Sequence, residues 1–330
     1  MSLASLYGQV PAVSLLRGIL RSGRLGHAYL FAGPDGAGKS VVAREFAKAV
    51  LCEKAGPDRV GDACDECSSC RRVAAGNHPD VLELRPDGRF KIEQARAALR
   101  HVEYKPLEGG AKIAVLLHAE SMTAEAANCL LKSMEEPPGS SLFILTAPSP
   151  AAVLPTVASR CQLVPFNTCS VDEVTAYLRA RHPGEEEERC RAAAFWSGGI
   201  PGKGDLFFEQ GFLSSRDRAL SILAGIRELD AIGTAGEVSK EEAPLLLECL
   251  SSLLRDLLVL GTGGPQGLLG NPDLAAALEK VAGTWKPDDC GKGMDELSRA
   301  YSAMAANANR RQTLDVLLVK LQALVEDGYN

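Results

Sequence analysis

Ala-Tyr-Leu-Phe-Ala-Gly-Pro-Asp-Gly-Ala-Gly-Lys-Ser occupies residues 28–40 of this 330-residue chain. The first five residues are apolar and predict a short buried strand, and the apolar positions of 40–50 recur at helical spacing. Between them, Gly33–Ser40 fits the pattern G-x-x-x-x-G-K-[ST] at every required position. Because the pattern follows a strand and opens a helix, it predicts a phosphate-binding loop.

The residue types of this loop suit the phosphates of a nucleotide such as ATP, bound together with Mg²⁺. Its glycines let backbone N–H groups turn toward phosphate oxygens at the N-terminus of the helix. We expect Lys39 to reach the β- and γ-phosphates and Ser40 to offer its hydroxyl to the metal ion. The candidate nucleotide-binding residues of the loop are Gly33, Gly36, Gly38, Lys39 and Ser40.

Two further apolar runs, at 113–117 and 141–146, also predict buried strands, and a helical pattern at 123–134 separates them. Continuously apolar strands that alternate with helices are typical of a parallel sheet covered on both faces. We therefore expect residues 1–166 to form an α/β domain. Beyond residue 166 the pattern is helical, which predicts a small helical module at 167–212 and an all-helical domain at 213–330. The last domain contains helical patterns near 216–230, 240–261, 273–282 and 293–326.

Composition and charge exclude several classes of protein. With 46% hydrophobic and 24% charged residues, the chain resembles an ordinary globular protein. The net charge is −6 and neither half is basic, which argues against autonomous sequence-specific DNA binding. No apolar stretch approaches the roughly 18 residues of a membrane span, and the first residues do not resemble a secretory signal. We expect a cytoplasmic protein without a membrane partner.

Four of the ten cysteines cluster with the spacing C-x11-C-x2-C-x2-C, namely Cys52, Cys64, Cys67 and Cys70. Four thiolates at such spacing can converge tetrahedrally, so we favour a structural zinc ion in an insertion at 52–70. An iron–sulfur cluster would want a cysteine where Ala74 stands, and it remains an alternative together with plain reduced thiols. Four sulfur ligands would leave no open position for a substrate.

The strand at 113–117 should carry the acidic residues that hydrolysis needs. An ATPase of this kind places one carboxylate at the end of a neighbouring strand to hold Mg²⁺ and often a second beside it. Here the two positions are Leu117 and His118. Glu120 is either a displaced carboxylate or a surface residue that leads into the next helix. We therefore expect nucleotide binding without independent turnover.

Several motifs in order resemble those of a known family. The phosphate loop, the four-cysteine insertion, Lys-Ser-Met-Glu-Glu-Pro-Pro at 132–138 and Ser-Arg-Cys at 159–161 are similar to the AAA+ subunits of bacterial DNA polymerase III clamp loaders, most of all to their delta-prime branch. The likeness starts at residues 6–9, includes His-Pro-Asp at 78–80, and covers most of 1–210.

The resemblance implies a function in DNA replication. In that family the sheet domain and a helical lid embrace ATP, and a helical collar joins gamma/tau, delta and delta-prime subunits in a hetero-pentamer. The complex places a sliding clamp on primed DNA, and DNA synthesis belongs to the polymerase holoenzyme. Arg160 matches the arginine finger that acts in trans on a neighbour's ATP, and Thr146 matches the first sensor position. Without the resemblance, Arg160 would be interpreted as half of a surface salt bridge.

The departures from the family distinguish the possible roles. The motor subunits carry an acidic pair where Leu117 and His118 stand, so the resemblance implies an arginine-donating subunit. A self-sufficient AAA+ ATPase of the gamma/tau motor type is the alternative function. A zinc-containing nucleic-acid binder is a third hypothesis, and the absence of a basic surplus argues against it.

Overall fold

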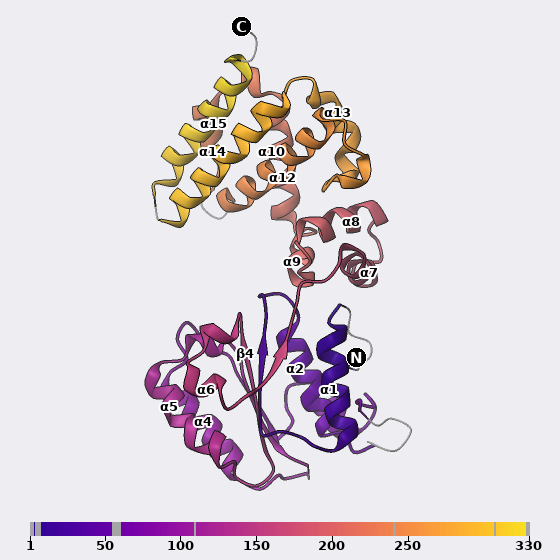
Figure 1. The fold of residues 1–330 in the computed structure, drawn as a ribbon, viewed down its shortest axis with the longest axis vertical. Helices are drawn as coiled ribbons and strands as arrows, with labels where there is room; N and C mark the ends of the chain where they lie inside the picture. The colour runs from indigo at the N-terminus through magenta and orange to yellow at the C-terminus, as the bar shows by residue number, and fades with distance from the viewer. Residues whose placement is uncertain are drawn as a thin grey trace. The chain divides into compact units, whose positions relative to one another are not determined.

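The computed structural model describes residue 3 and residues 8–54, 61–108, 110–239, 242–306 and 308–327 (Figure 1). Residues 6 and 7, where the family resemblance begins, lie outside these ranges. The chain divides into two compact units. The first is Met1–Glu173 with Ile200–Gly202, and the second is Val174–Gly199 with Lys203–Asn330. The boundary at residue 212 between lid and collar stays a prediction.

The first unit contains a five-stranded sheet in which every pair of neighbours is parallel, in the order β2-β3-β4-β1-β5. Its strands are β1 (Ala28–Ala32), β2 (Val81–Leu84), β3 (Lys112–Leu116), β4 (Ser141–Ala147) and β5 (Gln162–Pro165). The three predicted strands are confirmed as the three central ones, all fully buried. Strands β2 and β5 lie at the edges and are partly exposed, so they lack the continuous apolar signal.

Helices cover both faces of this sheet, as the sequence predicts. They are α1 (Val10–Ser22), α2 (Lys39–Val50), α3 (Ser68–Ala74), α4 (Ile92–Glu103), α5 (Ala124–Glu135) and α6 (Pro155–Ala158). Figure 1 shows α1 and α2 on one side of β4 and α4 and α5 on the other. Alternate residues of β1 enter different cores: the rings of Tyr29 and Phe31 contact Phe46 of α2, whereas Leu30 lies in the core that contains Leu130 of α5.

Beyond β5, the described part of the chain forms helices and no strands. The α-helices are α7 (Val171–Arg181), α8 (Glu187–Trp196), α9 (Pro201–Leu206), α10 (Gln210–Ala224), α11 (Ala231–Glu237), α12 (Ala243–Gly261), α13 (Ala275–Ala282), α14 (Pro287–Ala305) and α15 (Arg310–Asp327). Leu246, Leu250 and Leu253 of α12 are fully buried. Trp285 is buried as well, and its indole N–H donates to the Leu223 carbonyl at 3.1 Å. The second unit thus has its own apolar core.

The helical pattern at 293–326 is two helices and not one. Helix α14 ends at Ala305, and α15 begins at Arg310. The side chain of Asn309 accepts a hydrogen bond from the Gln312 N–H at 3.2 Å, so Asn309 caps the first turn of α15. Residues 306–309 contain neither proline nor glycine, so the sequence marks this break only weakly. In the part of the chain that the structure describes, we find no helix of the length and apolarity that a bilayer span requires.

Candidate nucleotide and metal sites

The phosphate loop adopts the conformation that its glycines predict. It runs from the end of β1 to Lys39, the first residue of α2. Gly36 and Gly38 have φ of 84° and 92°, in the left-handed region that favours glycine. Gly33 is required for another reason, because a Cβ there would lie 2.2 Å from the carbonyl oxygen of Phe166. Its N–H donates to the Ala147 carbonyl at 3.1 Å, which ties the loop to β4.

The Lys39 ammonium is bonded by the loop itself. It donates to the carbonyl oxygens of Gly33 and Pro34, the latter at 2.9 Å, and to a carboxylate oxygen of Asp35 at 3.0 Å. Its side chain is only 8% exposed, whereas that of Asp35 is 70% exposed. Asp35 therefore neutralises part of the charge that phosphate would meet, a role that sequence analysis missed. The available signal was its position four residues before Lys39.

Thr146 lies beside the loop, at the same edge of the sheet. It is buried on β4 and pairs in register with Phe31, two residues before Gly33. Its hydroxyl oxygen accepts a hydrogen bond from the His118 N–H at 3.1 Å. The carboxyl ends of β1, β3 and β4 therefore bring the phosphate loop, Thr146 and His118 to one region.

The end of β3 offers no carboxylate at the two expected positions. Leu117 is buried in the apolar core beside β3. His118 has φ 57° and ψ 52°, a left-handed conformation that is rare outside glycine. Its Nδ1 lies 3.2 Å from Glu120 Oε1, so Glu120 is engaged with His118 at the start of a short 3₁₀ turn, Ala119–Ser121. Ser40 is the second residue of α2, as the sequence predicts.

The four clustered cysteines come together as their spacing predicts. All four are buried, and their sulfur atoms lie within 4.8 Å of one another. Three sulfurs accept backbone hydrogen bonds: Cys52 from the Cys64 N–H at 3.4 Å, Cys64 from Cys67 at 3.3 Å, and Cys67 from Cys70 at 3.4 Å. Such bonds stabilise thiolates, the form that ligates metal. The cluster can therefore hold a metal ion.

The thiols of this cluster differ in how readily they ionise. Burial raises the pKa of Cys64, but the N–H groups of Glu66 and Cys67 and the neighbouring thiols lower it overall, to about 6. Burial raises the pKa of Cys70, and so does its contact with Cys67. A cation that binds all four sulfurs must displace protons from the reluctant thiols, so its affinity must fall as the pH falls.

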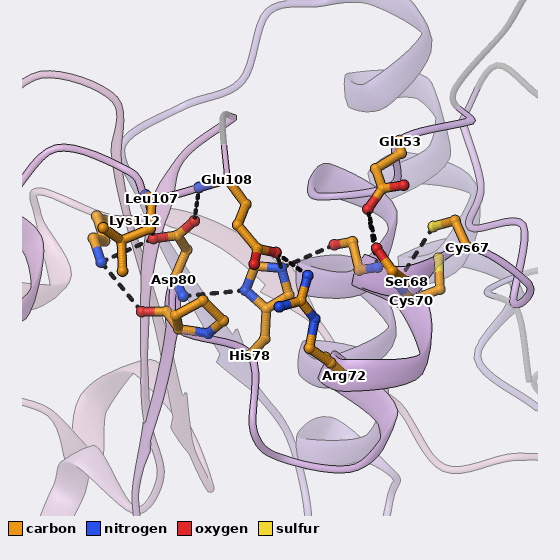
Figure 2. A network of polar contacts seen from close by, with 12 residues as sticks. Glu53, Cys67, Ser68, Cys70, Arg72, His78, Asp80, Leu107, Glu108 and Lys112 are labelled. Atoms are coloured by element: carbon orange, nitrogen blue, oxygen red, sulfur yellow. Dashed lines mark hydrogen bonds and ion pairs between the residues drawn. The ribbon is translucent and has the colours of Figure 1, made fainter.

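Residues 52–54 and 61–74 form a segment that we call the cysteine module. A polar network joins it to the sheet, as Figure 2 shows. Glu53 accepts hydrogen bonds from the Ser68 hydroxyl and the Ser69 N–H at the start of α3, at 2.6 and 3.1 Å. The Ser69 hydroxyl lies 3.0 Å from His78 Nε2, and His78 also faces Glu108 at 3.4 Å. Sequence analysis noted His78 only as part of a family motif, and its place here is structural.

Asp80 anchors the other end of this network (Figure 2). Its carboxylate is fully buried and accepts the N–H groups of Leu107 and Glu108 at 2.8 and 3.0 Å. It also pairs at 2.8 Å with the buried ammonium of Lys112, at the start of β3. Burial raises the pKa of Asp80, but these hydrogen bonds outweigh it and hold the pKa below its usual value. Removing one partner of such a pair is costly, so Asp80 fixes residues 107 and 108 to the start of β3. Its own N–H donates to His78 Nδ1 at 3.1 Å, which connects this anchor to the network.

Arg160 lies just after α6 and is paired within its own chain. Its Nε donates to Glu135 Oε1 at 2.8 Å, its Nη2 donates to the same oxygen, and its Nη1 donates to the Thr156 carbonyl at 2.7 Å. The Arg160 side chain is 30% exposed and that of Glu135 is 49% exposed. Arg160 thus forms the surface salt bridge that its sequence suggests without the family resemblance, with Glu135 as a partner that the sequence did not identify, and its role toward a neighbouring subunit stays a prediction.

Comparison with known proteins places the chain in a family. The family model described as "DNA polymerase III, delta subunit" matches residues 8–170. The delta' subunit of DNA polymerase III from Pseudomonas aeruginosa is 35% identical over 62% of this chain and 61% of its own length. The Bacillus subtilis delta' subunit is 38% identical over 48% and 47% of the two chains. These alignments span less than two thirds of either relative.

A longer alignment joins the chain to the Yersinia pestis delta' subunit, with 31% identity over 72% of this chain and 71% of the relative. Among solved structures, a gamma subunit-related protein of Thermotoga maritima matches with a TM-score of 0.51 and 19% identity, over 96% of this chain and 99% of its own. That match shows a similar fold over nearly the whole chain. The resemblance that the motifs indicate is confirmed, and this chain belongs to the DNA polymerase III delta-prime family.

Proposed function

We propose that the chain is a delta-prime-type subunit of a bacterial DNA polymerase III clamp loader, which helps to load the sliding clamp onto primed DNA. Its partners are the gamma/tau and delta subunits of a hetero-pentamer, and it reaches the clamp and DNA through that complex in the cytoplasm. The relatives' names and the family model support this role. Residues 167–212 act as the lid, and residues 213–330 form the collar.

One observation supports the proposal that this subunit binds ATP without hydrolysing it. The phosphate loop is intact, but the end of β3 presents buried Leu117 and a His118 engaged with Glu120 instead of a pair of carboxylates. A nucleotide can be held by the loop amides, Lys39 and Ser40, with Thr146 beside them. Neither expected position, Leu117 or His118, offers a carboxylate to hold Mg²⁺. It therefore binds ATP without turning it over and acts on a neighbour through Arg160.

The cysteine cluster holds a structural zinc ion in this proposal. Four buried sulfur donors match the preference of Zn²⁺ for tetrahedral thiolate coordination. A bound zinc ion would supply cross-linking of Cys52 to the segment 64–70. The chain's own groups do the rest, because backbone N–H bonds orient the sulfurs and Glu53 caps the start of α3.

The test replaces Arg160 in the reconstituted complex. Arg160→Ala should leave the subunit folded and reduce DNA-stimulated ATP hydrolysis at the neighbouring site by about 10³-fold, the lower end of the effect of an arginine finger. Arg179→Ala is the matched control, because Arg179 is also exposed and also paired with a carboxylate, that of Glu187. Undiminished hydrolysis in the Arg160 variant would return this residue to a surface salt bridge.

A second measurement separates this role from that of a motor subunit. ATP hydrolysis by the isolated chain, with Mg²⁺ and with or without primed DNA, should be absent. Robust DNA-stimulated turnover would mean that Glu120 or another carboxylate completes the site, and the chain would then be an ATPase of the gamma/tau type.

A further inference from the structure

Glu135 and Arg160 come from two segments that one apolar core holds in place. Glu135 is the last residue of α5, and Arg160 lies two residues after the end of α6. Val157 of α6 is fully buried in the same core as Leu130 and Met134 of α5. Because buried side chains on both helices fix the backbone, the two charged side chains start from rigid positions.

The hydrogen bonds engage all three nitrogens of the Arg160 guanidinium. Its Nε and Nη2 share Glu135 Oε1, while Nη1 is bonded to the Thr156 carbonyl and lies 3.5 Å from the Ser159 hydroxyl. Two anchors on different elements define both the position and the plane of the group. The guanidinium has more N–H donors than these bonds engage, and the spare ones lie on its terminal nitrogens.

The pair contributes little to the stability of the fold. Both side chains are partly exposed, and an ion pair of this kind is worth at most about 1 kcal/mol. Its value lies instead in preorganisation, because an arginine on a flexible stem must otherwise be ordered in the transition state. A positioning error of about 1 Å at a catalytic group can reduce a rate by about 100-fold.

We infer that Glu135 is a positioning residue for Arg160: it holds the guanidinium ready for the phosphates of the ATP bound by the neighbouring subunit. This inference rests on the proposed arginine-donating function. Glu135 does not touch the nucleotide, and it acts only through the hydrogen bonds to Arg160. A single carboxylate oxygen accepts both of these hydrogen bonds.

The experiment measures steady-state ATP hydrolysis by the complete clamp loader with primed DNA. Glu135→Ala should lower kcat about 10-fold with little change in KM for ATP, because the lost contact orders a group used in the transition state. Glu135→Gln retains an oxygen that can accept from Nε and should stay within about 3-fold of the parent. Glu136→Ala, which removes the neighbouring exposed carboxylate, should have no effect.

A double variant shows whether Glu135 acts through Arg160. Glu135→Ala combined with Arg160→Ala should be no slower than Arg160→Ala alone. A further loss in the double variant would mean that Glu135 acts elsewhere and would overturn the inference. Thermal unfolding of each purified subunit should stay within about 3 °C of the parent, as expected for an exposed pair.

The remaining outcomes distinguish this inference from the function on which it rests. If Arg160→Ala slows hydrolysis but Glu135→Ala leaves it unchanged or raises it, the positioning role is wrong and the arginine finger stands. If Arg160→Ala itself has no effect, the proposed function fails, whatever Glu135 does.

Discussion

The two ends of helix α2 carry two sites of opposite construction. At its N-terminus, Lys39 lies in a loop whose carbonyl oxygens and Asp35 already bond its ammonium. Two residues past its C-terminus, Cys52 enters a cluster of four buried thiols whose sulfurs lie within 4.8 Å of one another. The first site is built from backbone held by the sheet, and the second is built from side chains.

This difference separates an exchangeable ligand from a resident one. The phosphate loop is held in place by the sheet, because Gly33 is bonded to β4 and packs on Phe166. Six residues of the cysteine module lie in the apolar core, but four of them are the cysteines themselves, and their sulfurs accept mainly weak N–H to sulfur bonds. A small segment of this kind usually depends on its metal for folding. We expect the nucleotide to bind and dissociate repeatedly, and the metal ion to remain bound.

The largest expected effect is loss of the metal. Cys67→Ser should remove about one zinc ion per chain and expose the amides of residues 61–74 to hydrogen exchange, because structural zinc contributes on the order of 10 kcal/mol to folding of a small module. Metal analysis and hydrogen exchange provide the measurements. Cys129→Ser, outside the cluster, is the control and should keep the metal. Iron in the purified protein, or no metal at all, would contradict the assignment.

The next effect concerns the other end of α2. Lys39→Ala should weaken nucleotide binding by about 100-fold, since it removes charge-assisted hydrogen bonds to the phosphates. Fluorescence titration with a labelled ATP analogue measures the affinity. The variant should keep its full metal content, which would show that the two ends of the helix are independent. Unchanged nucleotide affinity would contradict the assignment of residues 33–40 as the nucleotide-binding loop.

The smallest effect sharpens the comparison within the phosphate loop. Asp35→Asn should tighten nucleotide binding by up to about 5-fold, because it removes a negative charge that competes with phosphate for Lys39 and that solvent largely screens. The same titration measures it, with Asp87→Asn as a control at another exposed aspartate. Weaker binding in Asp35→Asn would show that the carboxylate orients Lys39 and does not compete with the ligand.

Local patterns made the centre of the first unit predictable. A strand buried on both faces is apolar throughout, which identified β1, β3 and β4, and Thr123 marked the start of α5, whose first turn its hydroxyl caps. The edge strands β2 and β5 are not predicted by the apolar pattern, because a strand that faces solvent does not need apolar residues throughout. The break before α15 escaped because one asparagine cap is a weak signal within a long helical repeat.

The candidate sites also differ in how far the sequence predicts them. The glycines around Lys39 and the spacing of the four cysteines were legible in the sequence, because each site is assembled from neighbouring residues under strict local geometry. The pairing of Arg160 with Glu135 and that of Asp80 with Lys112 join residues 25 and 32 positions apart. Such contacts exist only once the sheet and its helices have packed, so no local pattern encodes them, and the tertiary structure alone decided how the arginine is held.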